Sequence, residues 1–135
     1  MERTFIDAGV LIAAARGNDE LAARSMAVLD DANREFVGSP FLKLEVVPQP
    51  TYHQRQVEVA FMNEFFNGVQ EWAPLSEDLL RVAMQQACRF GLDAVDALHV
   101  AAALLLGAGE LVTAEKSTKP ICRVTSLKVT TIRPA

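Results

Sequence analysis

The sequence predicts an α/β fold in which helices cover both faces of a mostly parallel sheet of four to five strands. Short apolar runs typical of strands alternate with longer segments of helical periodicity, in the order strand, helices, strand, helices, strand, helices, strand, strand. The 135 residues contain no internal repeat, low-complexity segment or linker that would divide them. We therefore expect a single domain over residues 1–135.

The first half of the chain is expected to hold two strands and four helices. Their ranges are 3–7, 8–17, 18–33, 35–39, 39–47 and 53–69, of which the first and the fourth are strands. Asn18 is the expected N-cap of the second helix and Ser39 that of the third, where Pro40 takes the first helical position. The prolines that follow residue 47 are expected to end this third helix. The last helix carries apolar residues at helical spacing, among them Val57 and Phe61.

The second half is expected to hold three strands and two helices. Their ranges are 69–75, 76–91, 93–109, 110–114 and 127–132, of which the second and the third are helices. Ser76 and Gly91 bound the first of these helices. The second is apolar almost all round, so we expect it at the centre of the fold. Functional groups gather at the carboxyl ends of strands in such folds, and Asp7 and Glu115 each follow a strand.

Composition places the chain among ordinary globular proteins, because 50% of the residues are hydrophobic and 22% are charged. We expect no signal peptide, because Asp7 interrupts the apolar N-terminal stretch. We expect no membrane helix either, because the most apolar window, 97–108, is far shorter than the roughly 20 residues that span a bilayer. Two cysteines, Cys88 and Cys122, are too few for a disulfide framework or a zinc site. They indicate reduced thiols in a cytoplasmic protein.

The net charge of −4 is unevenly distributed along the chain. The last twenty residues contain no acid and five bases, Lys116, Lys119, Arg123, Lys128 and Arg133. The acidic remainder argues against unaided binding of nucleic acid, but not against a site where bound cations bridge acids to phosphates. The basic segment is either a phosphate contact or a solvated edge strand whose lysines deter pairing between sheets.

Several acids have a structural interpretation beside the functional one. Asp7 is suited to cap the helix that follows it. Glu45 lies in the last turn of a helix, where an acid opposes the helix dipole, so it is either solvent-facing or functional. Glu115 fits a surface loop in which Lys116 or Lys119 pairs with it.

Asp93 and Asp96 lie at the start of the most apolar helix. Asp93 is the expected N-cap, and Asp96 then meets free N–H groups and a favourable dipole. The two carboxylates share a face and repel each other unless a cation lies nearby, either a metal ion or an arginine or lysine. His99, one turn further on, is expected to be a hydrogen-bonded core residue.

Taken as a set, these acids are expected to converge on one edge of the parallel sheet. No clustered cysteines or histidines accompany them, and carboxylates alone make sites that suit Mg²⁺ or Mn²⁺ rather than zinc. Such an ion lowers the pKa of a bound water and stabilises charge on a phosphoryl oxygen. This chemistry is that of phosphodiester hydrolysis.

The segments TFIDAGVLIAA and DAVDALHVAAALLLGAGELVTAEK, with the helix of Glu45 and the closing strand, resemble the PIN-domain ribonucleases, in particular the VapC-like toxins of bacterial toxin–antitoxin pairs. The resemblance runs nearly end to end, and its most specific part is D-A-L-H-x-A followed by L-V-T-x-acid. It implies an α/β/α sandwich, an acidic pocket that binds Mg²⁺ or Mn²⁺, and hydrolysis of RNA. A cognate antitoxin and a homodimer are implied as well.

The resemblance also assigns roles to individual residues. The catalytic acids that it implies are Asp7, Glu45, Asp96 and Glu115. Asp7, Asp96 and Glu115 are expected to bind the metal, and Asp93 is a helix cap that is also a candidate for holding a metal-bound water. Glu45 is expected to bind through water or to take a proton from the attacking water. Thr113 matches the threonine ahead of the last acid of the family, and Lys116 and Lys119 are expected to contact the RNA backbone.

Two departures from the family pattern keep a second function open. Glu115 stands where the family usually has aspartate, and Ala8 and Gly9 stand where it often has a serine, threonine or asparagine. A non-catalytic PIN-like module that binds RNA or protein therefore remains the alternative. A phospho-receiver domain is disfavoured because no acid follows the third strand, and a haloacid-type phosphatase because Gly9 occupies the position of its second aspartate.

Overall fold

One sheet of five parallel strands, in the order β3-β2-β1-β4-β5, forms the centre of the computed structural model, which describes residues 1–135. The strands are β1 (Glu2–Ile6), β2 (Arg34–Gly38), β3 (Glu71–Trp72), β4 (Glu110–Thr113) and β5 (Lys128–Thr131). The expected mostly parallel sheet is thus parallel throughout. β1 lies at its centre, with Phe5 in register with Val37 on one side and Leu111 on the other.

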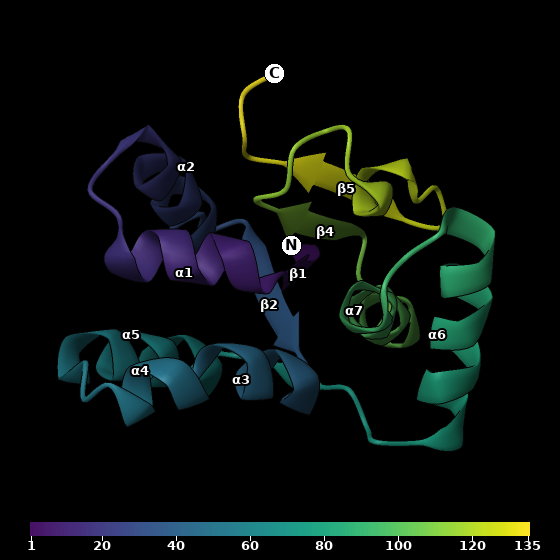
Figure 1. Ribbon diagram of the computed structural model, residues 1–135, viewed down its shortest axis with the longest axis horizontal. Helices are drawn as coiled ribbons and strands as arrows, with labels where there is room; N and C mark the ends of the chain where they lie inside the picture. The colour runs from purple at the N-terminus through teal and green to yellow at the C-terminus, as the bar shows by residue number, and fades with distance from the viewer.

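Seven α-helices and one short 3-10 helix connect the strands (Figure 1). They are α1 (Ala8–Arg16), α2 (Glu20–Leu29), α3 (Pro40–Val46), α4 (Pro48–Tyr52), α5 (Gln56–Asn67), α6 (Glu77–Phe90), α7 (Ala94–Leu105) and η1 (Pro120–Arg123). Figure 1 shows α7 end-on between the strands and α6, and α1 between α2 and the layer of α3 to α5. No helix is long and apolar enough to cross a membrane.

Helices cover both faces of the sheet, as the sequence predicts. The ring of Phe5 contacts His99 of α7, with centroids 5.5 Å apart, whereas Phe36 of β2 contacts Phe65 of α5 at 5.7 Å. Phe36 is paired with Thr4, so Phe5 and Phe36 are one residue out of register and point to opposite faces. The sheet is therefore the middle layer of an α/β/α sandwich, with α7 on one side and α5 on the other.

Side-chain caps begin most of the helices. Asp7, Ser39, Ser76 and Asp93 accept hydrogen bonds from the first turns of α1, α3, α6 and α7. The expectation for α2 is wrong by one residue: Asp19, not Asn18, is its N-cap and accepts from the Ala22 N–H at 3.0 Å. Gly91 ends α6 in the left-handed conformation, with φ of 69°, which glycine adopts without strain.

The segment after α3 departs from the expected structure. Pro48 does not end the helical region but occupies the first turn of α4, where the fixed φ of proline is favourable and no N–H is needed. The helix expected over 53–69 accordingly begins only at Gln56. Val57 is 85% exposed, so it does not lie on the inner side of α5. The strand expected over 69–75 shrinks to two residues, Glu71 and Trp72.

Candidate functional site

Asp7 lies at the carboxyl end of β1, directly before α1, and is 6% exposed. Its Oδ1 accepts from the Val10 N–H at 3.4 Å, which is the capping bond of α1. Its Oδ2 accepts from the hydroxyl of Thr113, the last residue of β4. The Thr113 hydroxyl oxygen in turn accepts the Glu115 N–H at 3.0 Å. Thr113 thus joins the ends of β1 and β4 and places Asp7 and Glu115 at the same edge of the sheet.

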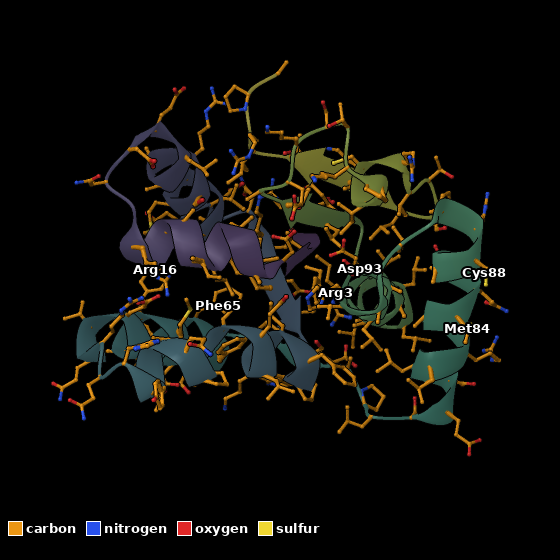
Figure 2. All side chains as sticks on the ribbon, viewed as in Figure 1. Arg3, Arg16, Phe65, Met84, Cys88 and Asp93 are labelled. Carbon is orange, nitrogen blue, oxygen red and sulfur yellow. The ribbon has the colours of Figure 1, made fainter.

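Asp93 and Asp96 come to this edge from the first turn of α7. Asp93 is the N-cap, and its Oδ1 accepts from the Asp96 N–H at 2.9 Å (Figure 2 labels Asp93). Burial, and then the negative charges of Asp93, Asp7 and Glu115, raise the pKa of Asp96 to about 6, against the opposing effect of His99. The four carboxylates therefore lie near enough to repel one another. We call Asp7, Asp93, Asp96 and Glu115 the acidic cluster.

The acidic cluster has no cationic protein partner. None of its four carboxylates forms an ion pair with a lysine or arginine. Burial also raises the pKa of Asp7, although the hydrogen bond from Thr113 and the neighbouring His99 act in the opposite direction. The sequence left two kinds of cation open as partners of Asp93 and Asp96, a metal ion or an arginine or lysine. The structure places no arginine or lysine there.

Glu45 reaches the site from the last turn of α3, where it contacts His99 of α7. The Nε2 of His99 lies 2.9 Å from the Glu45 Oε1, and the two side chains are 1% and 37% exposed. The other ring nitrogen, Nδ1, is buried without a hydrogen-bond partner. His99 is thus a hydrogen-bonded core residue, as expected. Glu45 is neither purely solvent-facing nor within the acidic cluster, but is held beside it through His99.

The donor set fits a hard divalent cation by its chemistry, since it consists of carboxylate oxygens without a partner charge. The side chains do not converge as they stand: no group of three or more His, Cys, Asp or Glu side chains is arranged to hold an ion. Metal binding would therefore require the carboxylates to close around the ion. Because Asp93 and Glu115 are exposed, they can change rotamer without disturbing the core.

Gly9 is explained by close packing of α1 against the end of β4. A Cβ atom built on Gly9 would lie 3.0 Å from the Ala114 Cβ and 3.6 Å from the Asp7 Oδ1. A side chain at this position would thus press on the strand end that holds Asp7. The departure at Gly9 from the usual family pattern coincides with a close approach of α1 to the end of β4.

The sequence did not predict where two side chains of the site lie: Cys122 had no signal, and Arg133 stood only as one of five bases in the C-terminal segment. Cys122 of η1 lies near the acidic cluster, with its Sγ 3.5 Å from the Lys116 carbonyl. Burial and then the charges of Asp7, Glu115 and Asp96 raise the pKa of its thiol. Arg133 donates from Nε to the Ala114 carbonyl at 2.8 Å, so it lies beside the end of β4. Neither position follows from local spacing, since each depends on how the C-terminal segment returns to the sheet. The Glu45–His99 contact had a partial signal, because His99 follows Asp96 by three residues on one helix face.

The architecture and the acidic edge can be compared with known proteins. The family model of the PIN domain matches residues 4–123. The chain belongs to the PIN domain family. This PIN domain has no match among curated protein sequences.

Solved structures with the same fold include several toxin–antitoxin complexes. A toxin–antitoxin complex from Klebsiella pneumoniae superposes with a TM-score of 0.77 at 17% identity, covering 98% of this PIN domain and 99% of that chain. VapBC2 from Rickettsia felis, bound to a DNA fragment from its promoter, gives 0.72 at 12% identity, with 96% and 98% covered. VapBC-1 from Haemophilus influenzae gives 0.66 at 16%, with the same coverage. At these identities the likeness establishes the fold of this PIN domain.

Proposed function

We propose that this PIN domain is an Mg²⁺- or Mn²⁺-dependent endoribonuclease and the toxin of a toxin–antitoxin pair in the cytoplasm. The observation that carries the proposal is the acidic cluster: four carboxylates at the carboxyl edge of the sheet repel one another and have no protein cation. A divalent ion would relieve this repulsion. When bound, it would supply Lewis-acid stabilisation of the phosphoryl oxygens and a water of lowered pKa.

Individual residues are assigned by the environment of each side chain. Asp7, Asp96 and Glu115 are the proposed ligands, and Asp93 is a fourth candidate. Thr113, which the sequence groups with Lys116 and Lys119 as a candidate substrate-binding residue, is instead proposed to position Asp7. Its hydroxyl holds the Asp7 carboxylate, which fixes the orientation of Asp7 before any ion binds. Pre-orientation of a ligand lowers the entropy cost of binding the ion.

Glu45 is the proposed proton acceptor. Its Oε1 is engaged by His99, but the side chain is 37% exposed, so its second oxygen is free to meet a water molecule. Lys116 and Lys119, both exposed in the loop after β4, are proposed to contact the RNA backbone. Their charges offset the repulsion between the acidic body and the phosphates.

An antitoxin protein and a second copy of the chain are the proposed partners. Structural neighbours that are toxin–antitoxin complexes support the antitoxin. Protein partners also accord with the exposed apolar side chains, which include Leu44, Tyr52, Val57, Leu75, Leu80 and Met84. Met84 and the Cys88 thiol point outward from α6 (Figure 2). The mass of the purified protein in solution tests the homodimer.

Cleavage of a mixed RNA pool tests the enzymatic proposal. We expect the purified protein, freed of any antitoxin, to cut RNA with Mn²⁺ or Mg²⁺, and not with EDTA. Asp96→Asn should lower the rate by at least about a hundredfold, because it removes a ligand charge. The matched control is Asp78→Asn, an exposed aspartate in the first turn of α6 that pairs only with Arg81 at 3.3 Å.

Equal cutting by the wild type and Asp96→Asn would contradict the proposed ligand set. No cutting by a folded wild type with metal present would favour the alternative, a non-catalytic PIN-like module that binds RNA or protein. That alternative is supported by the absence of a preformed metal-binding group and by Glu115 and the Ala8–Gly9 departure.

A further inference from the structure

The five basic residues of the C-terminal segment do not form one surface. Lys128 begins β5 at the amino edge of the sheet, where its Nζ lies 3.6 Å from the buried Glu110. Arg123 donates to the Phe90 carbonyl at 3.3 Å, near the end of α6. These two bases therefore interact with groups that lie outside the acidic cluster. The basic segment expected from the sequence is divided by the fold.

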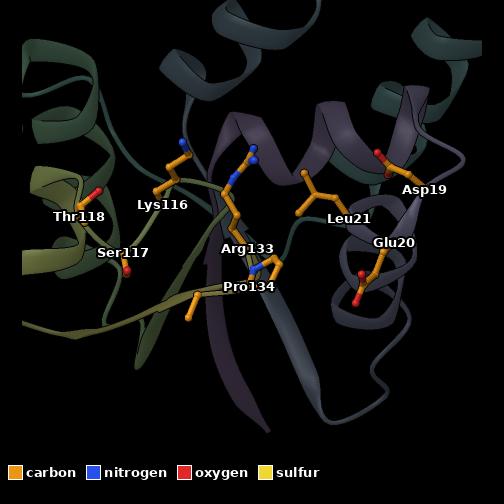
Figure 3. A pocket seen from close by; sticks show the side chains of 9 residues that line it. Asp19, Glu20, Leu21, Lys116, Ser117, Thr118, Arg133 and Pro134 are labelled. Atoms are coloured by element: carbon orange, nitrogen blue, oxygen red, sulfur yellow. The ribbon is translucent and has the colours of Figure 1, made fainter.

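Lys116 and Arg133, by contrast, line one cavity of about 630 Å³ (Figure 3). Its walls are three segments of the chain, namely 19–21 at the start of α2, 116–118 after β4, and 133–135 after β5. Figure 3 shows the side chains of Lys116 and Arg133 extending in the same direction, with both cationic ends toward α1. Lys119 does not line this cavity.

Arg133 is held in place by the strand ends that carry the acidic cluster. Its backbone N–H donates to the Thr131 hydroxyl at 3.1 Å, and its Nε donates to the Ala114 carbonyl at 2.8 Å. The Thr131 hydroxyl itself donates to the carbonyl of Glu115. These bonds fix the guanidinium one residue from a proposed metal ligand. Its two terminal nitrogens donate to no protein group, so a bidentate contact with a phosphate is available.

The acids on the opposite wall do not neutralise these cations. Asp19 is engaged as the N-cap of α2, and Glu20 pairs with Arg24 at 2.8 Å. Neither Lys116 nor Arg133 forms an ion pair with any carboxylate. Two cations without an ion-pair partner thus lie in a cavity beside an anionic cluster, an arrangement that attracts a phosphate which the cluster alone would repel.

We propose that this cavity is a phosphate subsite, in which Lys116 and Arg133 bind the RNA backbone phosphate adjacent to the one that is cleaved. The inference rests on the proposed ribonuclease function and adds a named subsite to it. The guanidinium of Arg133 is planar and held in place, so it sets the orientation of the bound phosphate. The flexible side chain of Lys116 can adjust to the position of that phosphate. Arg133, which the sequence offers only as one of the five bases of the C-terminal segment, becomes a named substrate-binding residue.

The test is the binding of a single-stranded 2′-O-methyl RNA oligonucleotide, measured by fluorescence anisotropy over a range of KCl concentrations with Mg²⁺ present. Because attack by a water molecule does not need the 2′-hydroxyl, a denaturing gel checks that the oligonucleotide stays intact during the measurement. Arg133→Gln and Lys116→Gln should each weaken binding several-fold at about 0.1 M salt. Each should also reduce the slope of log K against log salt by about 0.7, the value for one phosphate contact to a single strand. Arg133→Lys should retain the slope, because it retains the charge.

The control is Arg89→Gln, which removes an exposed positive charge from α6, where Arg89 stacks on Phe90 at 4.8 Å. Its Kd and slope should equal those of the wild type. Unfolding temperatures of all variants show whether loss of the Ala114 bond has disturbed β4. A second arm replaces the oligonucleotide with inorganic phosphate.

The outcomes separate this inference from the proposed function. If the wild type cuts RNA but Arg133→Gln and Lys116→Gln keep its Kd and slope, the subsite is wrong and the ribonuclease stands. A second outcome is that the wild type does not cut RNA, while both substitutions weaken oligonucleotide binding and reduce the salt slope. In that case the phosphate subsite is supported and the proposed ribonuclease activity is not. If inorganic phosphate binds as tightly as the oligonucleotide, the cavity is a free-anion site and the RNA assignment fails.

Discussion

Asp96 is subject to two opposing electrostatic effects at the first turn of α7. The free N–H groups and dipole of the helix N-terminus favour a carboxylate there. Burial and the charges of Asp93, Asp7 and Glu115 disfavour the ionised form and win, because they raise the pKa to about 6. The residue is therefore destabilising when charged and unpaired. Such a cost at one edge of the sheet is typical of a binding site.

The metal-free protein should lose stability as the pH rises through about 6. The pKa of Asp96 is raised from 3.8 to about 6 in the folded state, so the folded state binds this proton more tightly than the unfolded state. The stability that protonated Asp96 contributes to the folded state is fully present below about pH 4 and is lost above about pH 6. Because the Asp96 side chain is half-buried, we expect the free energy of unfolding to change by about 1 kcal/mol over this pH range. Asp7 acts in the same direction.

Urea denaturation in EDTA at pH 5 and pH 7.5 measures this effect. Asp96→Asn should be more stable than the wild type at pH 7.5, and the difference should shrink at pH 5. Mg²⁺ should stabilise the wild type at pH 7.5 and Asp96→Asn much less. A wild-type minus variant difference that does not change with pH would show that Asp96 is not the titrating group.

At the scale of elements, β4 has a structural end and a functional end. Its first residue, Glu110, is 3% exposed and accepts from Arg34 of β2 at 2.5 Å and from the hydroxyl of Thr130 of β5. Burial raises the pKa of Glu110, but these hydrogen bonds outweigh it and the net shift is downward. Its last residue, Thr113, holds Asp7 instead. One strand thus fastens the sheet at its amino edge and positions a carboxylate at the other.

Glu110→Ala should destabilise the protein by about 2 kcal/mol, because the largely buried Arg34 loses one of its two carboxylate partners and keeps only Asp31 at 3.1 Å. Mn²⁺ affinity, measured by electron paramagnetic resonance, should remain unchanged at a temperature where the variant is folded. Glu110→Gln should cost less, since it keeps hydrogen-bonding capacity at the site. Loss of metal binding in a folded Glu110→Ala protein would contradict the separation of the two strand ends.

At the scale of the whole molecule, parallel topology assembles the site from distant parts of the chain. The bond between Thr113 and Asp7 spans 106 residues, and that between His99 and Glu45 spans 54. The same topology places the carboxyl ends of β1 and β4 together, because adjacent parallel strands end at the same edge. The net charge of −4 means that the protein as a whole repels RNA, apart from local cations such as Lys116 and Arg133.

Divalent cations should therefore increase the affinity of the protein for RNA. For most nucleic-acid-binding proteins Mg²⁺ competes for the phosphates and weakens binding. Here, at constant ionic strength, we expect about 5 mM Mg²⁺ to tighten the binding of a 2′-O-methyl oligonucleotide, because it neutralises the acidic cluster. Asp96→Asn should reduce this gain. Weaker binding on addition of Mg²⁺ would argue against cations as bridges between the acids and RNA.

Local signals explain how much of the fold was predictable from the sequence. The caps Ser39, Ser76 and Asp93 and the stop at Gly91 depend on a few adjacent residues, and each was placed correctly. The error at Pro48 has a local cause too, since a proline that cannot continue one helix is well suited to begin the next. The apolar spacing through Val57 and Phe61 does not mark the buried face of α5, which runs through Glu58, Met62 and Phe66.

Short-range patterns in the chain were enough to predict the fold class, a mostly parallel sheet and the positions of Asp7 and Glu115 after strands, because periodicity, caps and strand ends depend on neighbouring residues. Tertiary structure alone decided which side chains meet. The Thr113–Asp7 bond, the Glu45–His99 contact, and the pairing of Lys116 with Arg133 in one cavity depend on crossovers that join residues far apart in the chain. Spacing along a chain fixes neither the direction nor the partner of such side chains, whereas packing around a shared sheet does.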